Sequence, residues 1–190
     1  MQDEGAQLAT LMAAGHLRGR TARVLDACAA PGGKAFHLAE LLGPGSEVVA
    51  VELHPRKAEA LRQEARRRGL AVTVICADAS GPVPGLEEGS FDAVLVDAPC
   101  AGLGTLRRHP ELKLRRDAPD LARLAALQLG ILRASARYAR PGAPVTYALC
   151  SLSRAEGEGV VAALLAEGWR REAAPAGIPA DALTAAGDLL

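Results

Sequence analysis

Five short runs of apolar and β-branched residues recur along the chain and predict five β-strands, at residues 22–27, 47–53, 71–77, 91–98 and 143–150. Each run is continuous rather than alternating, which is typical of strands buried on both faces of a parallel sheet. Segments with helical periodicity separate the runs. The alternation predicts a doubly wound α/β fold with a mostly parallel central sheet and right-handed crossovers.

Two helices are also indicated by the pattern. Residues 4–15 predict a short amphipathic helix, and a longer one begins near Asp117. One stripe of that longer helix carries Leu121, Leu124, Gln128, Ile131, Leu132 and Ser135. We interpret the 190 residues as one domain, with a helical lead-in at 1–20, a core at 21–175 and a truncated C-terminal segment at 176–190.

Composition narrows the class of protein. The chain is 49% apolar, and its 22 basic and 22 acidic residues give a net charge of zero. A protein without net charge does not bind nucleic acid by bulk charge alone. The four cysteines form no C-x-x-C pair, which argues against a zinc knuckle or a disulfide framework. No apolar run is long enough for a membrane span. We expect a soluble, cytoplasmic monomer without a metal ion.

The end of the first predicted strand carries a glycine-containing loop, and Glu52 ends the second strand, 19 residues beyond Gly33. Glycine here is also compatible with a plain strand-to-helix turn. Glu52, however, stands where a carboxylate commonly binds the ribose hydroxyls of an adenosine cofactor. The G-x-G-x-x-G pattern is missing and Pro31 removes a backbone donor, so the pattern favours a cofactor without phosphates, such as S-adenosylmethionine.

Two aspartates end the next strands. Asp78 follows the third strand and could accept a hydrogen bond from an adenine amino group, although an aspartate here could equally cap the loop. Asp97 ends the fourth strand, at the mouth of the expected pocket, where it could attract a sulfonium or bind a base ring. The carboxyl ends of parallel strands form the ligand-binding edge of such sheets.

Cys100 and Cys150 follow the fourth and fifth strands and are expected to face the same crevice. Cys76, and largely Cys28, are interpreted as small buried apolar residues. Ser153 and Glu156 have the spacing of a capping box, which predicts a helix start close to Cys150. A helix N-terminus favours a thiolate over a thiol, so Cys150 is a candidate nucleophile.

The long connection after Cys100 is rich in basic side chains. A charge run is often only a solvated face, but beside a reactive cysteine we interpret this one as a phosphate-contacting loop. The arginines at 66–68 sit at a predicted helix C-terminus, where they complement the helix dipole. The candidate phosphate-contacting residues are Arg107, Arg108, His109, Lys113, Arg115 and Arg116.

Five ordered motifs carry a resemblance that covers residues 2–169: DACAAPGGK, AVELHPRKAEAL, CADAS, DAPCAGLGTLRRHPELK and YALCSLSRAEGE. The chain resembles the Sun family of RNA cytosine-C5 methyltransferases, and within it the bacterial RsmB group that acts on 16S ribosomal RNA. The resemblance implies a Rossmann-like class I methyltransferase fold, S-adenosylmethionine as cofactor and RNA as partner. It also implies a catalytic domain that lacks an N-terminal RNA-binding region and a final strand.

Roles follow from the resemblance position by position. Cys150 matches the catalytic cysteine, which would add to C6 of cytosine, and Cys100 matches a second cysteine that would assist release. Asp97, protonated or through a group that it positions, would act at N3. The cofactor-binding positions would be Cys28, Ala29, Ala30, Pro31, Gly32, Gly33, Lys34, Glu52, Asp78 and Asp97.

Three positions depart from the family pattern: Leu149 replaces a common threonine, Ala101 a common serine and Gly157 an asparagine. None of them removes a reacting atom. Other reaction classes fit less well: a DNA cytosine-C5 methyltransferase would leave Cys150 without a role, and adenine-N6 enzymes carry a different motif after the fourth strand. A transfer RNA or another ribosomal cytosine remains an alternative substrate, and a non-catalytic RNA-binding module remains an alternative class.

Overall fold

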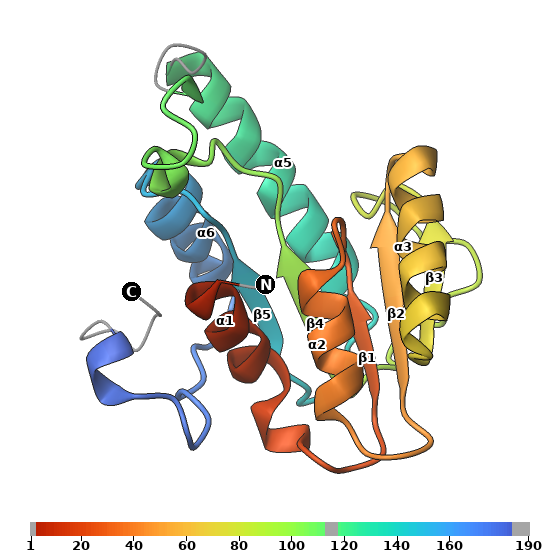
Figure 1. The fold of residues 1–190 in the computed structure, drawn as a ribbon. Helices are drawn as coiled ribbons and strands as arrows, with labels where there is room; N and C mark the ends of the chain where they lie inside the picture. The colour runs from red at the N-terminus through yellow and green to blue at the C-terminus, as the bar shows by residue number, and fades with distance from the viewer. Residues whose placement is uncertain (1–2, 113–117, 184–190) are drawn as a thin grey trace.

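The computed structural model describes residues 3–112 and 118–183. Five parallel strands form one sheet in the order β3-β2-β1-β4-β5 (Figure 1). The strand order reverses between β1 and β4, so the crevice at their carboxyl ends is the topological switch point where ligands bind in this class of sheet. The strands are β1 (Arg23–Asp26), β2 (Glu47–Glu52), β3 (Val72–Cys76), β4 (Ala93–Asp97) and β5 (Val145–Ala148).

Helices cover both faces of the sheet and enclose two apolar cores. One core packs α1, α2 and α3 against the sheet, with Leu38 and Leu61 at its centre. The other packs α5 and α6 against the opposite face, through Leu132 and Val160 among others. The helices are α1 (Glu4–Ala14), α2 (Gly33–Leu41), α3 (Pro55–Arg68), α5 (Ala118–Ala136) and α6 (Val160–Ala166).

The predicted fold class is confirmed, and each of the five predicted strands is present in a slightly shorter form. The first helix and the long helix after residue 117 are present as well. Five of the six positions of the predicted stripe on α5 are buried, while Leu121 is only half-buried.

Two expectations about burial were wrong. Only the three central strands are buried on both faces, because β3 and β5 form the edges of the described sheet and are partly exposed. Cys76 is exposed rather than buried for this reason, since it is the last residue of edge strand β3. Its Sγ lies 3.7 Å from the carbonyl oxygen of Leu53.

Candidate active site

A loop at residues 27–32 connects β1 to α2 and approaches the neighbouring elements closely. Gly32 caps α2 with a positive φ of 109°. A Cβ atom at this position would lie 2.5 Å from the ring of Phe36 and 2.6 Å from Leu61. Glycine is therefore required at residue 32 both for backbone conformation and for space.

The two acids of the neighbouring strand ends are held by backbone groups. The carboxylate of Glu52 is buried and accepts a hydrogen bond from the His54 N–H at 2.8 Å. The exposed carboxylate of Asp78 accepts the Ser80 N–H at 2.8 Å, which lowers the pKa of Asp78. This contact is the loop cap that the sequence left open as the alternative. An adenine contact by Asp78 stays a prediction.

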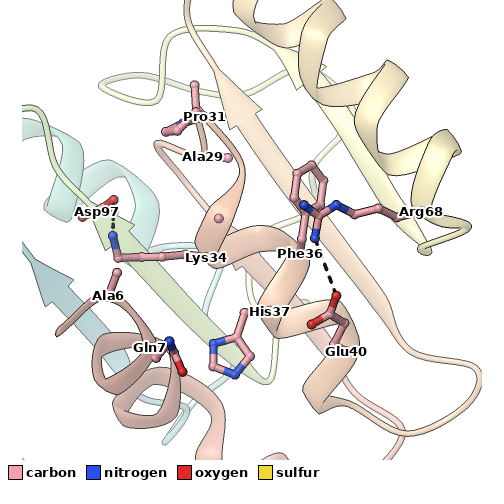
Figure 2. A pocket seen from close by; sticks show the side chains of 12 residues that line it. Ala6, Gln7, Ala29, Pro31, Lys34, Phe36, His37, Glu40, Arg68 and Asp97 are labelled. Carbon is pink, nitrogen blue, oxygen red and sulfur yellow. Dashed lines mark hydrogen bonds and ion pairs between the residues drawn. The ribbon is translucent and has the colours of Figure 1, made fainter. Parts of the chain in front are cut away.

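At the switch point, Lys34 reaches from α2 to Asp97 at the end of β4, with Nζ 2.6 Å from Oδ2 (Figure 2). Asp26, at the end of β1, is fully buried. Neither of its carboxyl oxygens has a hydrogen-bond partner of ordinary geometry in the described part of the chain. Burial, helped by the charge of Asp97, raises the pKa of Asp26 to about 7 against weaker opposing effects of Lys34 and the Cys28 backbone.

The structure brings Cys100 and Cys150 together. Their Sγ atoms lie 3.3 Å apart, with Cys150 exposed and Cys100 half-buried. Two backbone hydrogen bonds join the segments that carry them. The Ala98 N–H donates to the Ala148 carbonyl at 3.0 Å, and the Gly104 N–H donates to the Cys150 carbonyl at 2.9 Å. The two cysteines therefore follow adjacent strands whose ends are joined by backbone hydrogen bonds.

The two thiols differ in acidity. The hydrogen bond from Cys100 lowers the pKa of Cys150 to about 7, and Lys34 contributes in the same direction. The same contact and burial raise the pKa of the Cys100 thiol far above its ordinary value. Burial also raises the pKa of Cys28 to about 12, which fits its interpretation as an unreactive packing residue.

The predicted capping box after Cys150 is wrong. The segment Ala155–Gly159 is a π-helical turn that leads into α6, and no side chain caps it. Glu156 is completely buried and points into the protein, where its carboxylate accepts hydrogen bonds from Ala101 N–H, Gln128 Nε2 and Ser151 Oγ. The thiolate preference of Cys150 therefore has a different main cause, the neighbouring Cys100 thiol.

The connection after Cys100 runs over the surface and includes a 3₁₀ turn at Leu103–Thr105. Arg107, Arg108 and His109 are exposed on it. Arg108 pairs with Asp3 at 2.6 Å, and His109 Nδ1 lies 3.4 Å from a Glu111 oxygen. The other three candidate RNA-binding residues, Lys113, Arg115 and Arg116, lie outside the described residues. The three arginines at 66–68 lie in the last turn of α3, the predicted position, and Arg67 and Arg68 both pair with Glu64.

A hollow of about 560 Å³ adjoins the loop and runs along α2, between α1 and the end of α3 (Figure 2). Lys34 and Asp97 lie at one end of it, and Arg68, stacked on Phe36, lies at the other. The cysteine pair and Glu52 are not among its lining residues. The hollow is thus a neighbour of the cysteine site and shares the Lys34–Asp97 pair with it.

No cluster of three or more histidine, cysteine, aspartate or glutamate side chains with metal-binding geometry is present among residues 3–112 and 118–183. In the same ranges no helix is both long enough and apolar enough to cross a bilayer.

The sheet order and the helices on both faces define the Rossmann-like fold of S-adenosylmethionine-dependent methyltransferases. Residues 17–185 match the model of the family described as 16S rRNA methyltransferase RsmB/F. The chain therefore belongs to the RsmB/F family.

Curated relatives support the same assignment. The chain is 46% identical over 159 residues to ribosomal RNA small subunit methyltransferase B of Thermus thermophilus, which covers 83% of this chain and 38% of the relative. It is 42% identical over 168 residues to the Vibrio cholerae protein of the same name, covering 87% of this chain and 37% of that protein. The chain thus spans little more than a third of the length of these relatives.

Solved structures show the same architecture. The crystal structure of NSun6 from Pyrococcus horikoshii with SFG superposes with a TM-score of 0.77 at 26% identity, over 91% of this chain and 43% of that one. A methyltransferase homologue from the same organism superposes with a TM-score of 0.70 at 27% identity, over 87% of this chain and 50% of the other.

Three residues of the site were missed by sequence reasoning. In the sequence, Asp26 is only the first residue of the DACAAPGGK motif, Gln128 only a position of the helical stripe and Glu156 only half of the predicted capping box. All three are completely buried polar side chains. Gln128 did carry a signal, because an amide within an otherwise apolar helical stripe needs a hydrogen-bond partner inside the protein.

Proposed function

We propose that this chain is the catalytic domain of an RNA cytosine-C5 methyltransferase that acts on 16S ribosomal RNA. The observation that carries the proposal is the pair of sulfurs 3.3 Å apart at the switch-point edge, with the exposed Cys150 as the more acidic thiol. Family membership and the names of the relatives support the ribosomal substrate.

The residues at the strand ends fit a nucleoside cofactor. Glu52 supplies a buried carboxylate for ribose hydroxyls, and close packing of Gly32 on Phe36 and Leu61 fixes the neighbouring loop beside the strand ends. The relative that was crystallised with SFG, an analogue of S-adenosylmethionine, supports the same cofactor here. When bound, S-adenosylmethionine would supply the methyl group.

In the proposed mechanism Cys150 is the nucleophile. C5 of cytosine is a weak nucleophile, so the Cys150 thiolate first forms a bond to C6 and moves electron density onto C5, which can then accept the methyl group. Lys34, which Asp97 holds, or Asp97 itself when protonated, would donate a hydrogen bond or proton toward N3 and stabilise the adduct. The C5–H electron pair then re-forms the C5–C6 double bond and the C–S electron pair returns to Cys150. Cys100, deprotonated after Cys150 has bonded to carbon, would assist this step by accepting the C5 proton.

Two cysteine variants test these roles with labelled S-adenosylmethionine and 16S RNA, free and in small subunits. Cys150→Ala should abolish methyl transfer, whereas Cys100→Ala should accumulate a covalent protein–RNA adduct, visible as a slower band on a denaturing gel. Cys76→Ala, at the exposed end of β3, is the matched control and should leave turnover unchanged.

The outcomes separate the alternatives. Normal turnover of Cys100→Ala without an adduct would overturn the assigned roles of the two cysteines. Labelled transfer RNA or DNA in place of 16S RNA would overturn the substrate. A wild-type chain that fails to bind S-adenosylmethionine in calorimetry would favour the non-catalytic RNA-binding module.

A further inference from the structure

Glu156 lies beneath the cysteine pair and contacts the segments on both sides of it. Its Oε1 accepts the N–H of Ala101, the residue after Cys100, at 2.8 Å. Its Oε2 accepts the hydroxyl of Ser151, the residue after Cys150, at 2.5 Å. One carboxylate therefore joins the residue that follows each cysteine.

Gln128 of α5 extends this network to the other side of Cys100. Its Nε2 donates to the Pro99 carbonyl and to Glu156 Oε1, each at 2.9 Å. The Tyr147 hydroxyl in β5 lies 2.9 Å from Gln128 Oε1 and 2.7 Å from the Glu156 carbonyl oxygen. Gln128 and Glu156 are fully buried, so the network contacts little water.

Such an arrangement is demanding, because a buried carboxylate without hydrogen bonds destabilises a fold strongly. Here three donors satisfy Glu156, and two of them come from the segments that carry the sulfurs. A glutamate on the surface of the same turn shows the contrast: Glu158 is exposed and pairs with Arg154. Burial and a full set of partners thus distinguish Glu156 from its neighbour two residues away.

We propose that Glu156 is a positioning residue for the cysteine pair, whose carboxylate fixes the two cysteine-bearing segments so that Cys100 Sγ stays within hydrogen-bonding distance of Cys150 Sγ. The inference rests on the proposed function, because that function assigns catalytic roles to the two cysteines. Glu156 itself contacts neither sulfur, and it acts through Ala101 and Ser151.

The acidity of Cys150 reports on this positioning. Cys100, a backbone hydrogen bond at Cys150 and Lys34 lower its pKa, whereas burial and the charge of Asp97 raise it. The contribution of Cys100 is the largest and depends on the distance between the sulfurs. A loosened pair should therefore raise the pKa of Cys150 toward the ordinary thiol value of about 8.5.

The experiment measures the rate of iodoacetamide alkylation of each cysteine against pH, with peptide mass mapping of the whole chain in the absence of RNA and cofactor. For wild type we expect a midpoint near pH 7 at Cys150. In Glu156→Ala the midpoint should rise by more than one pH unit, which lowers the rate at pH 7 by about tenfold because far less thiolate is present.

Two variants show whether the hydrogen bonds are the cause. Glu156→Gln keeps an acceptor for Ala101 and Gln128 and offers its amide N–H to the Ser151 oxygen, so it should restore most of the wild-type midpoint. Glu158→Ala removes a glutamate from the same turn without touching either cysteine segment, and its midpoint should equal that of wild type.

A folded Glu156→Ala protein with an unchanged Cys150 midpoint would overturn the proposal. If that variant does not fold, as judged by circular dichroism, Ser151→Ala replaces it, since it deletes the 2.5 Å contact on the Cys150 side together with the longer 3.3 Å hydrogen bond from the Ser153 N–H. Its midpoint should rise by a smaller amount, and an unchanged midpoint would again contradict the positioning role. The readout needs no methyl transfer, so failure of this proposal is distinct from failure of the proposed function, which the Cys150→Ala variant tests.

Discussion

At the scale of single residues, Asp26 is the carboxyl group whose ionisation the fold disfavours most clearly. Burial raises its pKa from 3.8 to about 7, so the folded state binds the proton more tightly than the unfolded chain does. The stabilising effect of that proton is complete below about pH 4 and is lost as the pH rises through 7. Above pH 7 the fold carries a buried negative charge.

Asp26→Asn should therefore stabilise the protein in a pH-dependent way. At pH 8 the free energy of unfolding should exceed that of wild type by up to about 4 kcal/mol, and the difference should shrink toward zero near pH 4. Urea unfolding at a series of pH values measures this difference.

Asp78→Asn is the matched control, because Ser80 lowers the pKa of the exposed Asp78 and the small effect should have the opposite sign. If Asp26→Asn destabilises the protein at pH 8, neighbouring groups must stabilise the ionised Asp26 carboxylate despite its burial, which would contradict the prediction.

At the scale of elements, the start of α2 depends on a glycine that two neighbours enclose. In Gly32→Ala the new Cβ would meet Phe36 and Leu61 in addition to the unfavourable φ of 109°. Gly69→Ala, at the end of α3, is the control, since its φ of 66° is also positive but no atom lies within 4 Å of the new Cβ.

We expect Gly69→Ala to cost about 1 kcal/mol of stability and Gly32→Ala about 1–3 kcal/mol more, because overpacking adds to the backbone strain. Urea unfolding of the two variants compares them. Equal costs would show that the loop relaxes away from Phe36 and is looser than the close contacts imply.

The elements themselves were predictable because a doubly wound sheet has a simple pattern. The continuous apolar runs around Val49 and Leu95 indicate strands covered on both faces, and the order of the runs limits the topology. Cys76 shows where this reasoning ends, because apolar content cannot tell an edge strand from a central one. Which strand becomes an edge depends on pairing partners that lie far away in the sequence.

The candidate site was predictable in part. Motif order correctly placed Cys100, Cys150, Asp97 and Lys34 at one edge, since the carboxyl ends of parallel strands share that edge. Ser153 and Glu156 misled, because the spacing of a capping box is also compatible with a glutamate that points inward. The packing of α5 against this turn places Gln128 and Ala101 where they donate hydrogen bonds to the Glu156 carboxylate. The sequence alone does not show this packing.

At the scale of the whole molecule, charge is balanced but unevenly placed. The net charge is zero, while Arg107 and Arg108 are exposed on the segment that follows Cys100. RNA affinity in a neutral domain should therefore depend on a few local phosphate contacts and not on the overall field.

Salt dependence tests this view. In Arg107→Ala we expect weaker binding of a single-stranded 16S fragment and a slope of log K against log salt that is smaller by about 0.7, the value for one lost contact to a single strand. Fluorescence anisotropy at several salt concentrations measures both quantities. Arg67→Ala, whose side chain pairs with Glu64 on α3, should change neither, and equal effects of the two variants would exclude a localised RNA surface.

The contact between the two sulfurs has a consequence for the order in which the two thiols lose their protons. As the pH rises through about 7, Cys150 loses its proton while Cys100 keeps its own, so the pair then holds one proton and one negative charge. In the proposed mechanism, Cys150 loses this negative charge once its sulfur is bonded to carbon, and the proton on Cys100 then becomes easier to remove. If Cys150 is the nucleophile, Cys100 should therefore gain acidity only after Cys150 has reacted.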